Sequence, residues 1–249
     1  MPLAVTAAFG LLIGSFLNVV AWRLPRRESL VSPRSACPDC GTAVRAYDNV
    51  PVLSWLLLRA RCRDCGAHIS ARYPVVELVT ALLFAAVVAV KGVDGDAALG
   101  LALVTLLVPV ALIDYEHRII PNRLLLPGAL IGLVILAVTD RGALPEHLVA
   151  AVAAGGFLLV AALAYPSGMG MGDVKLAAVL GLFLGRAVAP ALLIALLAGV
   201  VVGIVVMARK GTREGRKTAV PFGPFLALGG LAGLFAGSAI VDWYSGTFL

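Results

Sequence analysis

The stretch Ser167-Gly168-Met169-Gly170-Met171-Gly172-Asp173-Val174-Lys175 separates two long apolar segments. Its three closely spaced glycines cannot form a stable helix interior, since each costs up to about 1 kcal/mol there. Irregular backbone at membrane depth is tolerated where it lines a water-filled cavity. An ionisable side chain at that depth is expensive and therefore marks a candidate functional site. Glycines also let a substrate backbone approach closely as an extended strand, so we expect Gly170, Gly172 and Lys175 to line a substrate cleft beside Asp173.

The composition places the rest of the chain in a membrane. Of its 249 residues, 61% are hydrophobic and only 14% are charged, whereas a soluble domain is about 45–50% apolar and about 25% charged. Roughly 20 apolar residues span a bilayer. We expect an all-α polytopic membrane protein with about eight transmembrane helices; seven is the rival count, because the sixth span is short. We expect the first span to be retained and not cleaved as a signal peptide. The expected spans are Leu3–Trp22, Val75–Val90, Ala97–Ile113, Leu124–Thr139, Leu148–Tyr165, Val174–Gly185, Val188–Ala208 and Phe222–Val241.

Lysine and arginine are distributed unevenly between the loops. On eight spans, the loops on one side carry 17 of these residues and the loops on the other side carry three. Cytoplasmic loops are the ones enriched in Lys and Arg, so we expect both termini outside and Asp114 and Asp173 on the cytoplasmic side. This bias accounts for the net charge of +6. We therefore expect contact with anionic membrane lipids and no nucleic-acid partner.

All four cysteines fall in the large loop between the first two expected spans. They form two Cys-x-x-Cys pairs separated by 21 residues, a spacing typical of zinc sites. Four thiolates make a closed tetrahedral Zn²⁺ site with a folding role and no open position for catalysis. The alternatives are free thiols or two disulfides, which a reducing compartment disfavours, and His68 is a possible substitute ligand. The ligands expected for a small cytoplasmic zinc-knuckle loop domain are Cys37, Cys40, Cys62 and Cys65.

Each cysteine pair is followed by a glycine, Gly41 or Gly66. Glycine lets the chain turn back on itself, so that the backbone can approach the sulfur atoms. We expect the knuckle to belong to an N-terminal region, residues 1–91, that includes the first two spans. A six-span region, residues 97–249, follows.

A second acid, Asp114, ends the apolar segment Gly100–Ile113. Two close carboxyl groups share a proton, so that one can activate water while the other donates to a carbonyl oxygen. Asp114 and Asp173 together therefore predict an aspartyl protease, with the base and the acid not assigned between them. Taken alone, Asp114 could be an interfacial charge and Asp173 a helix N-cap. Glu116 is a weaker rival to Asp114, and acids such as Asp48 and Asp64 are expected to be solvated loop charges.

These motifs together resemble the type IV prepilin peptidases, a bacterial family of GxGD membrane aspartyl proteases. The resemblance runs nearly from end to end and follows the order of motifs in the family. The matching segments are Gly14–Val20 with Arg23-Leu24-Pro25, the paired cysteines, Arg72–Leu78, Asp114–Pro121, Gly170–Lys175 and Pro221–Phe225.

The resemblance implies a substrate and two activities. Family members remove the basic leader of a type IV prepilin or pseudopilin precursor, after a glycine, at the cytoplasmic face of the bacterial inner membrane. Catalytic roles carry over to Asp114 and Asp173 by motif match. Members with the cysteine domain also methylate the new N-terminal amine with S-adenosylmethionine as the methyl donor.

The methylation site is harder to place, because no G-x-G-x-x-G nucleotide-binding motif is present. Glu77 is a candidate to hold the ammonium group of the substrate or to accept its proton. Alternatively, Glu77 is an interfacial carboxylate paired with Arg72 or Lys175. Ser15 and Asn18 are expected to hold helices together.

Two other functions remain open at this point. One is the same peptidase without transferase activity. The other is a transporter or assembly scaffold in which the acids move protons or pair with cations. The acids cluster at one face and no inverted internal repeat is found, which argues against a transporter.

Overall fold

The computed structural model describes residues 2–165, 169–211 and 220–248. Ser167 and Gly168 of the glycine-rich stretch lie outside these ranges, as do Arg213, Arg216 and Lys217, which contribute to the charge bias of the loops. The chain divides into two compact units, Met1–Gly92 and Val93–Leu249. The described residues form helices and no strand, so the all-α class is confirmed.

The first unit pairs two long helices, α1 (Pro2–Arg23) and α3 (Arg72–Lys91). Their backbones lie close together where α1 carries glycines. A Cβ atom on Gly10 or on Gly14 would lie 2.7 Å from a backbone atom of α3. Small residues are what allow this close approach between membrane helices. The loop that joins the two helices carries a 3-10 turn, η1 (Ala46–Asn49), and a short helix, α2 (Leu53–Leu57).

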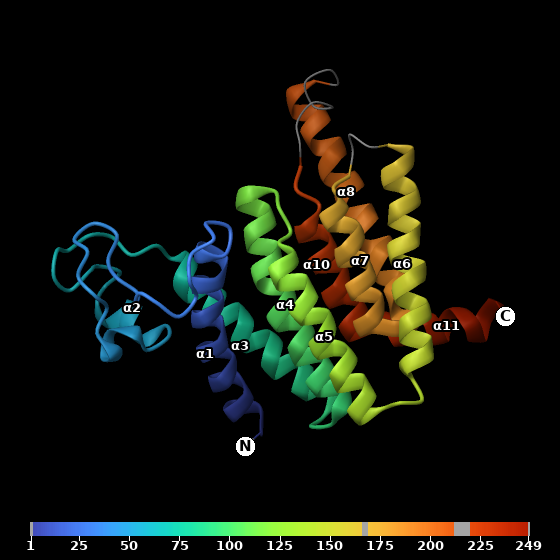
Figure 1. Ribbon diagram of the computed structural model, residues 1–249, viewed down its shortest axis with the longest axis horizontal. Coiled ribbons are helices and arrows are strands. Elements are labelled where there is room, and N and C mark those ends of the chain that lie inside the picture. Colours follow the sequence, from blue (N-terminus) through green and yellow to red (C-terminus); the bar gives the residue numbers. More distant parts are fainter. Residues whose placement is uncertain (1, 166–168, 212–219, 249) are drawn as a thin grey trace. The chain divides into compact units, whose positions relative to one another are not determined.

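The second unit is a helical bundle in which α7 and α10 are central (Figure 1). α7 packs against α5, α6 and α10, and α10 packs in turn against α4 and α8. Ten of the 14 residues of α7 are buried, so its neighbours shield most of it from lipid. The elements of this unit are α4 (Gly95–His117), α5 (Asn122–Thr139), α6 (Leu144–Ala164), α7 (Met171–Leu184), η2 (Gly185–Ala187), α8 (Val188–Lys210), α10 (Gly223–Ala232), η3 (Gly233–Gly237) and α11 (Ser238–Phe248).

Seven helical stretches of the described residues are long and apolar enough to cross a bilayer. One of them, Met171–Lys210, has 40 residues, about 60 Å at the rise of an α-helix and twice the thickness of the hydrocarbon core. The chain reverses at η2, where Gly185 has a φ of +53°, and α7 and α8 run in opposite directions in Figure 1. This stretch therefore makes two passes, which gives eight in all, and the short sixth span is α7.

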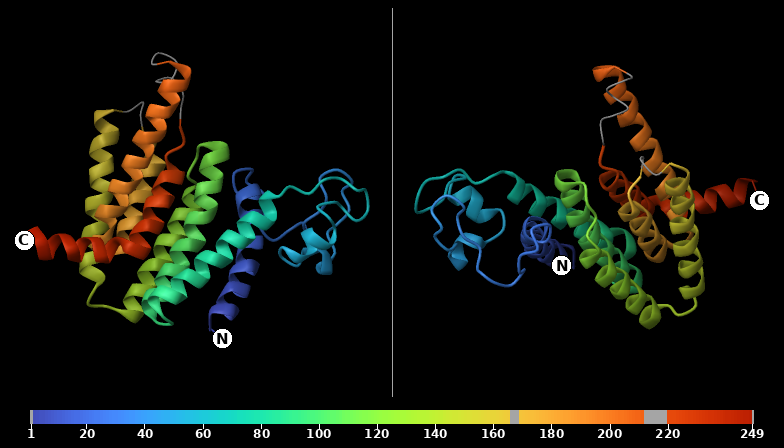
Figure 2. Two further views of the ribbon diagram at one scale, coloured as in Figure 1. Left: turned by 180° about the vertical axis from the view of Figure 1, so that it is seen from behind. Right: turned by 45° about the horizontal axis from the view of Figure 1, so that its top comes forward.

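The central helices α7 and α10 are shorter than the hydrocarbon core. α7 has 14 residues, or about 21 Å. α10 has 10 residues and the π-helical turn η3 adds five, after which α11 turns away from the axis of α10 (Figure 2). Beyond the C-terminal ends of α7 and α10, Arg186 of η2 pairs with Asp242 of α11 at 3.1 Å. Asp173 and Gly223, in the first turns of these two helices, are buried within the bundle.

Gly181 of α7 tests the packing of this bundle. A Cβ atom there would collide with the carbonyl oxygen of Ala150 in α6, so we expect Gly181→Ala to destabilise the fold by about 1–3 kcal/mol through overpacking. The matched control is Gly156→Ala in α6, where a Cβ atom would have no neighbour within 4 Å and alanine favours the helix by up to about 1 kcal/mol. Thermal unfolding in detergent should show a lower Tm for Gly181→Ala only. Equal Tm values for the two variants would contradict this packing.

Candidate active site and metal centre

Asp114 lies in the last turn of α4, with only 5% of its surface exposed. Its Oδ2 atom accepts a hydrogen bond of 2.8 Å from the backbone N–H of Gly223, the first residue of α10. The first N–H groups of a helix have no intrahelical partner, and the helix dipole makes that end positive. The start of α10 therefore stabilises the carboxylate of Asp114. Glu116, the rival acid, is exposed.

Glycine at position 223 is needed for this contact. A Cβ atom there would lie 2.7 Å from Oδ2 of Asp114 and 2.9 Å from its carboxyl carbon. Any side chain would push the helix start away from the acid. The Pro221–Phe225 run matches the family pattern in sequence, but nothing in it identifies Gly223 as the partner of Asp114. The available signal was a glycine between the prolines that open a helix.

Asp173 is the third residue of α7 and is 8% exposed. Its Oδ2 atom accepts a hydrogen bond of 3.1 Å from the backbone N–H of Gly170. A side chain at the third helical position that returns to the N-cap backbone is one half of a capping box. The N-cap residue is Gly170, so the alternative that Asp173 is itself the N-cap is wrong.

The carboxyl groups of Asp114 and Asp173 share two features. Both are buried, and each is held through Oδ2 by a backbone N–H group at the start of a helix. Two such carboxyl groups brought close together could not both ionise cheaply and would share a proton. One ionised and one protonated carboxyl is the state that hydrolysis by two acids requires.

The expected cleft residues take different places around this pair. Gly170 has an extended backbone, with φ −83° and ψ 150°, directly beside Asp173. Gly172 packs closely against Ile120, since a Cβ atom on Gly172 would lie 3.0 Å from the Cβ of Ile120. Lys175 donates from Nζ to Oδ1 of Asn122 at 3.1 Å, which ties α7 to the start of α5.

The four cysteines of the first unit form one cluster. Their sulfur atoms all lie within 4.8 Å of one another, and the Sγ atoms of Cys37 and Cys65 are 3.8 Å apart. Tetrahedral Zn–S bonds of about 2.3 Å would place the sulfurs about 3.8 Å apart. All four thiols are free, so the disulfide alternative is not observed, and His68 is not part of the cluster. The set of donors fits one closed, tetrahedral metal site.

Each cysteine pair sits in the same kind of backbone loop. The N–H of Cys37 donates to a carbonyl five residues later at 3.0 Å, and the N–H of Cys62 does the same at 2.7 Å. Gly41 and Gly66 have φ values of +71° and +74°, in the left-handed region that favours glycine. The turn predicted after each pair is therefore present, and both loops present their sulfurs alike.

The thiols of the cluster affect one another's pKa values. Hydrogen bonds with the side chain and backbone of Thr42 lower the pKa of Cys40 to about 7. A backbone hydrogen bond from Ala67 lowers the pKa of Cys65, but burial and the hydrogen bonds of the other three thiols outweigh it and raise that pKa to about 12. Binding of a metal at this cluster would require the thiols to lose their protons.

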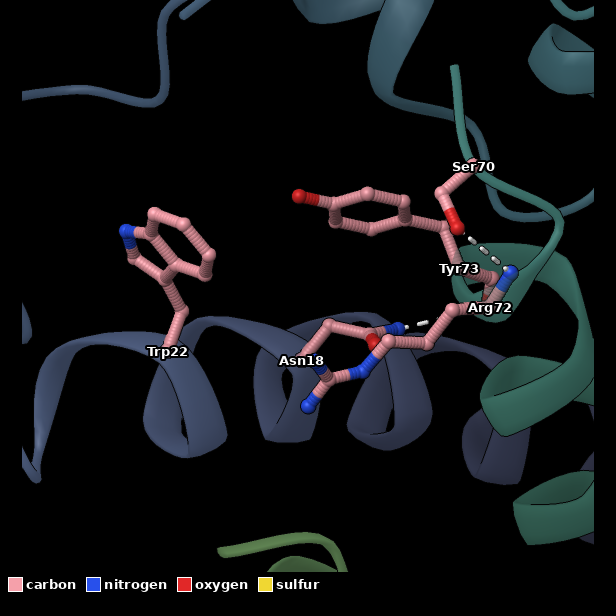
Figure 3. A pocket seen from close by; sticks show the side chains of 5 residues that line it. All are labelled: Asn18, Trp22, Ser70, Arg72 and Tyr73. Carbon is pink, nitrogen blue, oxygen red and sulfur yellow. Dashed lines mark hydrogen bonds between the residues drawn. The ribbon is translucent and has the colours of Figure 1, made fainter. Parts of the chain in front are cut away.

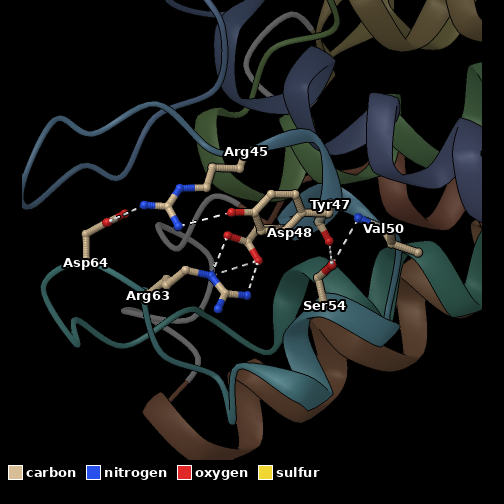
Figure 4. Close-up of polar contacts among 7 residues, drawn as sticks. All are labelled: Arg45, Tyr47, Asp48, Val50, Ser54, Arg63 and Asp64. Carbon is tan, nitrogen blue, oxygen red and sulfur yellow. Dashed lines mark hydrogen bonds and ion pairs between the residues drawn. The ribbon is translucent and has the colours of Figure 1, made fainter.

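Ion pairs connect the second cysteine loop to the segment around η1 (Figure 4). Arg63 binds the carboxylate of Asp48 through two nitrogens, with contacts of 2.6 and 2.9 Å, and this hydrogen bonding holds the pKa of Asp48 below its usual range. Arg45 donates to both Asp64 and the hydroxyl of Tyr47 at 3.1 Å. Asp48 is therefore paired and largely covered, contrary to the expectation of a solvated charge. Asp64 also has an ion-pair partner but is an exposed loop residue, as expected. A bidentate pair of this kind fixes geometry as well as charge.

Glu77 lies in the second turn of α3 and is 6% exposed. Its Oε2 atom accepts a hydrogen bond of 2.7 Å from the backbone N–H of Val52, the N-cap residue of α2. Val52 has a φ of +61°, which is rare for a β-branched residue. The carboxylate thus joins α2 of the knuckle loop to α3, a contact that the sequence did not reveal.

Comparison with known proteins gives matches along nearly the whole chain. Residues 8–91 match the Bacterial Peptidase A24 N-terminal domain, and residues 101–207 match the Type IV leader peptidase family. No solved structure matches.

Several similar proteins carry the name prepilin leader peptidase/N-methyltransferase. The one from Burkholderia pseudomallei (strain 1026b) is 39% identical over 268 residues, which cover 96% of this chain and 86% of that protein. The one from Aeromonas hydrophila is 37% identical over 272 residues, 97% of this chain and 93% of that protein. The one from Myxococcus xanthus (strain DK1622) is 45% identical over 182 residues, where the match spans 70% of this chain and about half of that protein, 54%. With the family's order of motifs, the paired acids and the cysteine cluster all present, the chain belongs to the type IV leader peptidase family.

Proposed function

We propose that this multi-pass membrane protein cleaves the leader of type IV prepilin-like precursors with Asp114 and Asp173, and that it N-methylates the new N-terminus. The observation that carries the peptidase is the pair of buried carboxyl groups, each held through Oδ2 by a backbone N–H group at the start of a helix. The names of the relatives, prepilin leader peptidase/N-methyltransferase, support the substrate class and the second activity.

In the proposed reaction, one carboxylate takes a proton from water while the protonated partner donates to the carbonyl oxygen of the scissile bond. The hydroxide adds to the carbonyl carbon, the amine leaves with a proton, and the leader ends in a free carboxylate. The hydrogen bonds from Gly223 and Gly170 both use Oδ2. They fix the two carboxyl groups and leave Oδ1 of each for water and substrate.

The proposed substrate suits the depth of this site. A prepilin has an apolar helix that rests in the bilayer and a basic leader outside it, so its scissile bond lies near the membrane surface. The ends of α6 and α8 extend beyond the starts of α7 and α10 (Figure 1), which sets the acids below the ends of the neighbouring helices. The excess of Lys and Arg supports a cytoplasmic position for this end of the bundle. A glycine before the cut fits beside the extended backbone of Gly170.

For the first unit we propose a structural Zn²⁺ ion held by Cys37, Cys40, Cys62 and Cys65. Four thiolate ligands leave no open position, so the metal stabilises the loop and does not take part in catalysis. The proposed methyl donor is S-adenosylmethionine, which carries a methyl group on a sulfonium. Glu77 is the group proposed to hold the ammonium of the substrate or accept its proton.

Replacing either acid tests the peptidase directly. We expect Asp114→Asn and Asp173→Asn each to lower the rate of prepilin cleavage by about 10³-fold or more, as for members of a catalytic unit. The control Glu116→Gln removes the exposed neighbouring acid and should keep the rate within about twofold. The assay follows cleavage in detergent by mass spectrometry of both products. Normal cleavage by both Asp variants would refute the peptidase assignment and favour a transporter or scaffold.

Gly223 provides a test of the helix-start contact. We expect Gly223→Ala to lower the kcat of cleavage by about 10-fold or more, because the new Cβ atom displaces the N–H group from Asp114. Gly203→Ala in α8, where a Cβ atom would meet nothing within 4 Å, is the matched control. Unchanged kcat in a folded Gly223→Ala protein would show that Asp114 does not depend on this contact.

The metal site can be tested by elemental analysis of the purified protein. We expect about one zinc per chain, loss of that zinc in Cys62→Ser, and earlier unfolding of the knuckle loop when a chelator is added. His68→Ala should retain the metal because this residue lies outside the cluster. Full zinc content in Cys62→Ser, or loss of zinc in His68→Ala, would contradict the proposed ligand set.

A further inference from the structure

A pocket of about 210 Å³ lies between the end of α1 and the start of α3 (Figure 3). It lies entirely within the first unit and involves none of the catalytic acids or cysteines. Its volume is below the roughly 300–1,000 Å³ of sites that enclose a whole drug-sized ligand, so it suits one end of a larger molecule. Its lining residues are Asn18, Trp22, Ser70, Arg72 and Tyr73.

Asn18 contributes an unused acceptor to this pocket. Its side chain is 4% exposed, and Nδ2 donates to the carbonyl oxygens of Gly14 at 3.3 Å and Tyr73 at 3.2 Å. Since both partners are acceptors, the nitrogen must face them, and this fixes the orientation of the amide. Oδ1 is then buried without a hydrogen-bond partner in the described part of the chain. A buried acceptor left unsatisfied costs about 1–3 kcal/mol, which a ligand with an N–H donor would relieve.

Arg72 contributes the positive charge of the pocket, and its side chain lies across Asn18 in Figure 3. Its backbone N–H is held by Oγ of Ser70 at 3.2 Å, which fixes the start of α3. A guanidinium group recognises a carboxylate through paired hydrogen bonds. Trp22 and Tyr73, both nearly half exposed, stand at the mouth, where aromatic faces attract cations.

An acceptor beside a guanidinium is the complement of an α-amino acid, whose ammonium and carboxylate groups share one carbon. We propose that the pocket binds the methionine end of S-adenosylmethionine, with the ammonium on Oδ1 of Asn18 and the carboxylate on Arg72. In this proposal the Arg72 side chain turns to the carboxylate, and the ammonium reaches Oδ1 of Asn18. The nucleoside lies outside the pocket. This inference rests on the proposed transferase activity and assigns its donor site.

The position of the pocket fits that role. Tyr73 and Glu77 are four residues apart in α3 and therefore lie on the same face, one helical turn from each other. On α1, Asn18 and Ser15 are three residues apart, and the hydroxyl of Ser15 contacts the carboxylate of Glu77. The donor site thus lies one turn from the residue proposed to handle the substrate amine.

The test measures ligand binding to the full-length protein in detergent by calorimetry, with no acceptor peptide present. Three ligands are compared: S-adenosylmethionine, S-adenosylhomocysteine and 5′-methylthioadenosine, the last of which lacks the amino-acid end. We expect Arg72→Gln, and independently Asn18→Ala, to weaken binding of the first two by at least about 10-fold. The affinity for 5′-methylthioadenosine should change by less than about twofold. The matched control is Arg34→Gln, which removes an exposed arginine of the loop that precedes α3 and should change none of the three affinities.

Each other outcome overturns the inference in a different way. Unchanged affinity for S-adenosylmethionine in Arg72→Gln would place the donor elsewhere and leave the proposed transferase intact. Equal weakening of all three ligands would indicate a general disturbance of the unit. Competition by phosphatidylethanolamine, with loss of lipid binding and not donor binding in the variants, would identify a headgroup site. If the wild type neither binds the donor nor methylates a cleaved prepilin peptide, the transferase half of the proposed function fails as well.

Discussion

The hydrogen bond from the N–H of Gly223 to Asp114 is the contact on which the arrangement of the active site depends. A carboxylate inside an apolar bundle is expensive unless it has a partner, and here the partner is the start of a helix. For this hydrogen bond to form, α10 must begin next to Asp114 and α4 must end beside the start of α10. The first residue of α10 must also be glycine. Asp173 meets the same demand within its own helix, through the N–H of Gly170. Two acids held in this way can approach each other and still accommodate one shared proton.

The shortness of α7 and α10 follows from the same demand. Each of the two helices is shorter than the hydrocarbon core, and Arg186 pairs with Asp242 beyond their C-terminal ends. The residues that begin them are therefore enclosed by longer neighbours, and the extended backbone before α7 lies next to Asp173. The first unit is organised by local contacts. Short loops with glycines hold the four sulfur atoms together, and α1 and α3 pack closely against each other.

The sequence was most informative where the signal is local. The spacing of the cysteines predicted their cluster, Gly41 and Gly66 predicted the turns behind them, and long apolar runs predicted the helices, including the short sixth span. Local sequence patterns did not predict the contacts between residues that are far apart in the chain. Gly223 follows Asp114 by 109 residues, and nothing in the Pro-Phe-Gly-Pro run identifies the acid that it meets. The contact of Glu77 with Val52, the pairing of Asp48 with Arg63 and the unsatisfied oxygen of Asn18 also depend on how segments pack, and local patterns do not encode that.

The central claim is that the two acids act as one catalytic unit. The most direct measurement of this is the residual rate of prepilin cleavage in the double variant Asp114→Asn/Asp173→Asn. Members of one catalytic unit are strongly non-additive. We therefore expect the cleavage rate of the double variant, folded as judged by its Tm, to be no lower than that of the slower single variant. Losses that multiply in the double variant would mean that the acids act independently, and would contradict a shared-proton pair.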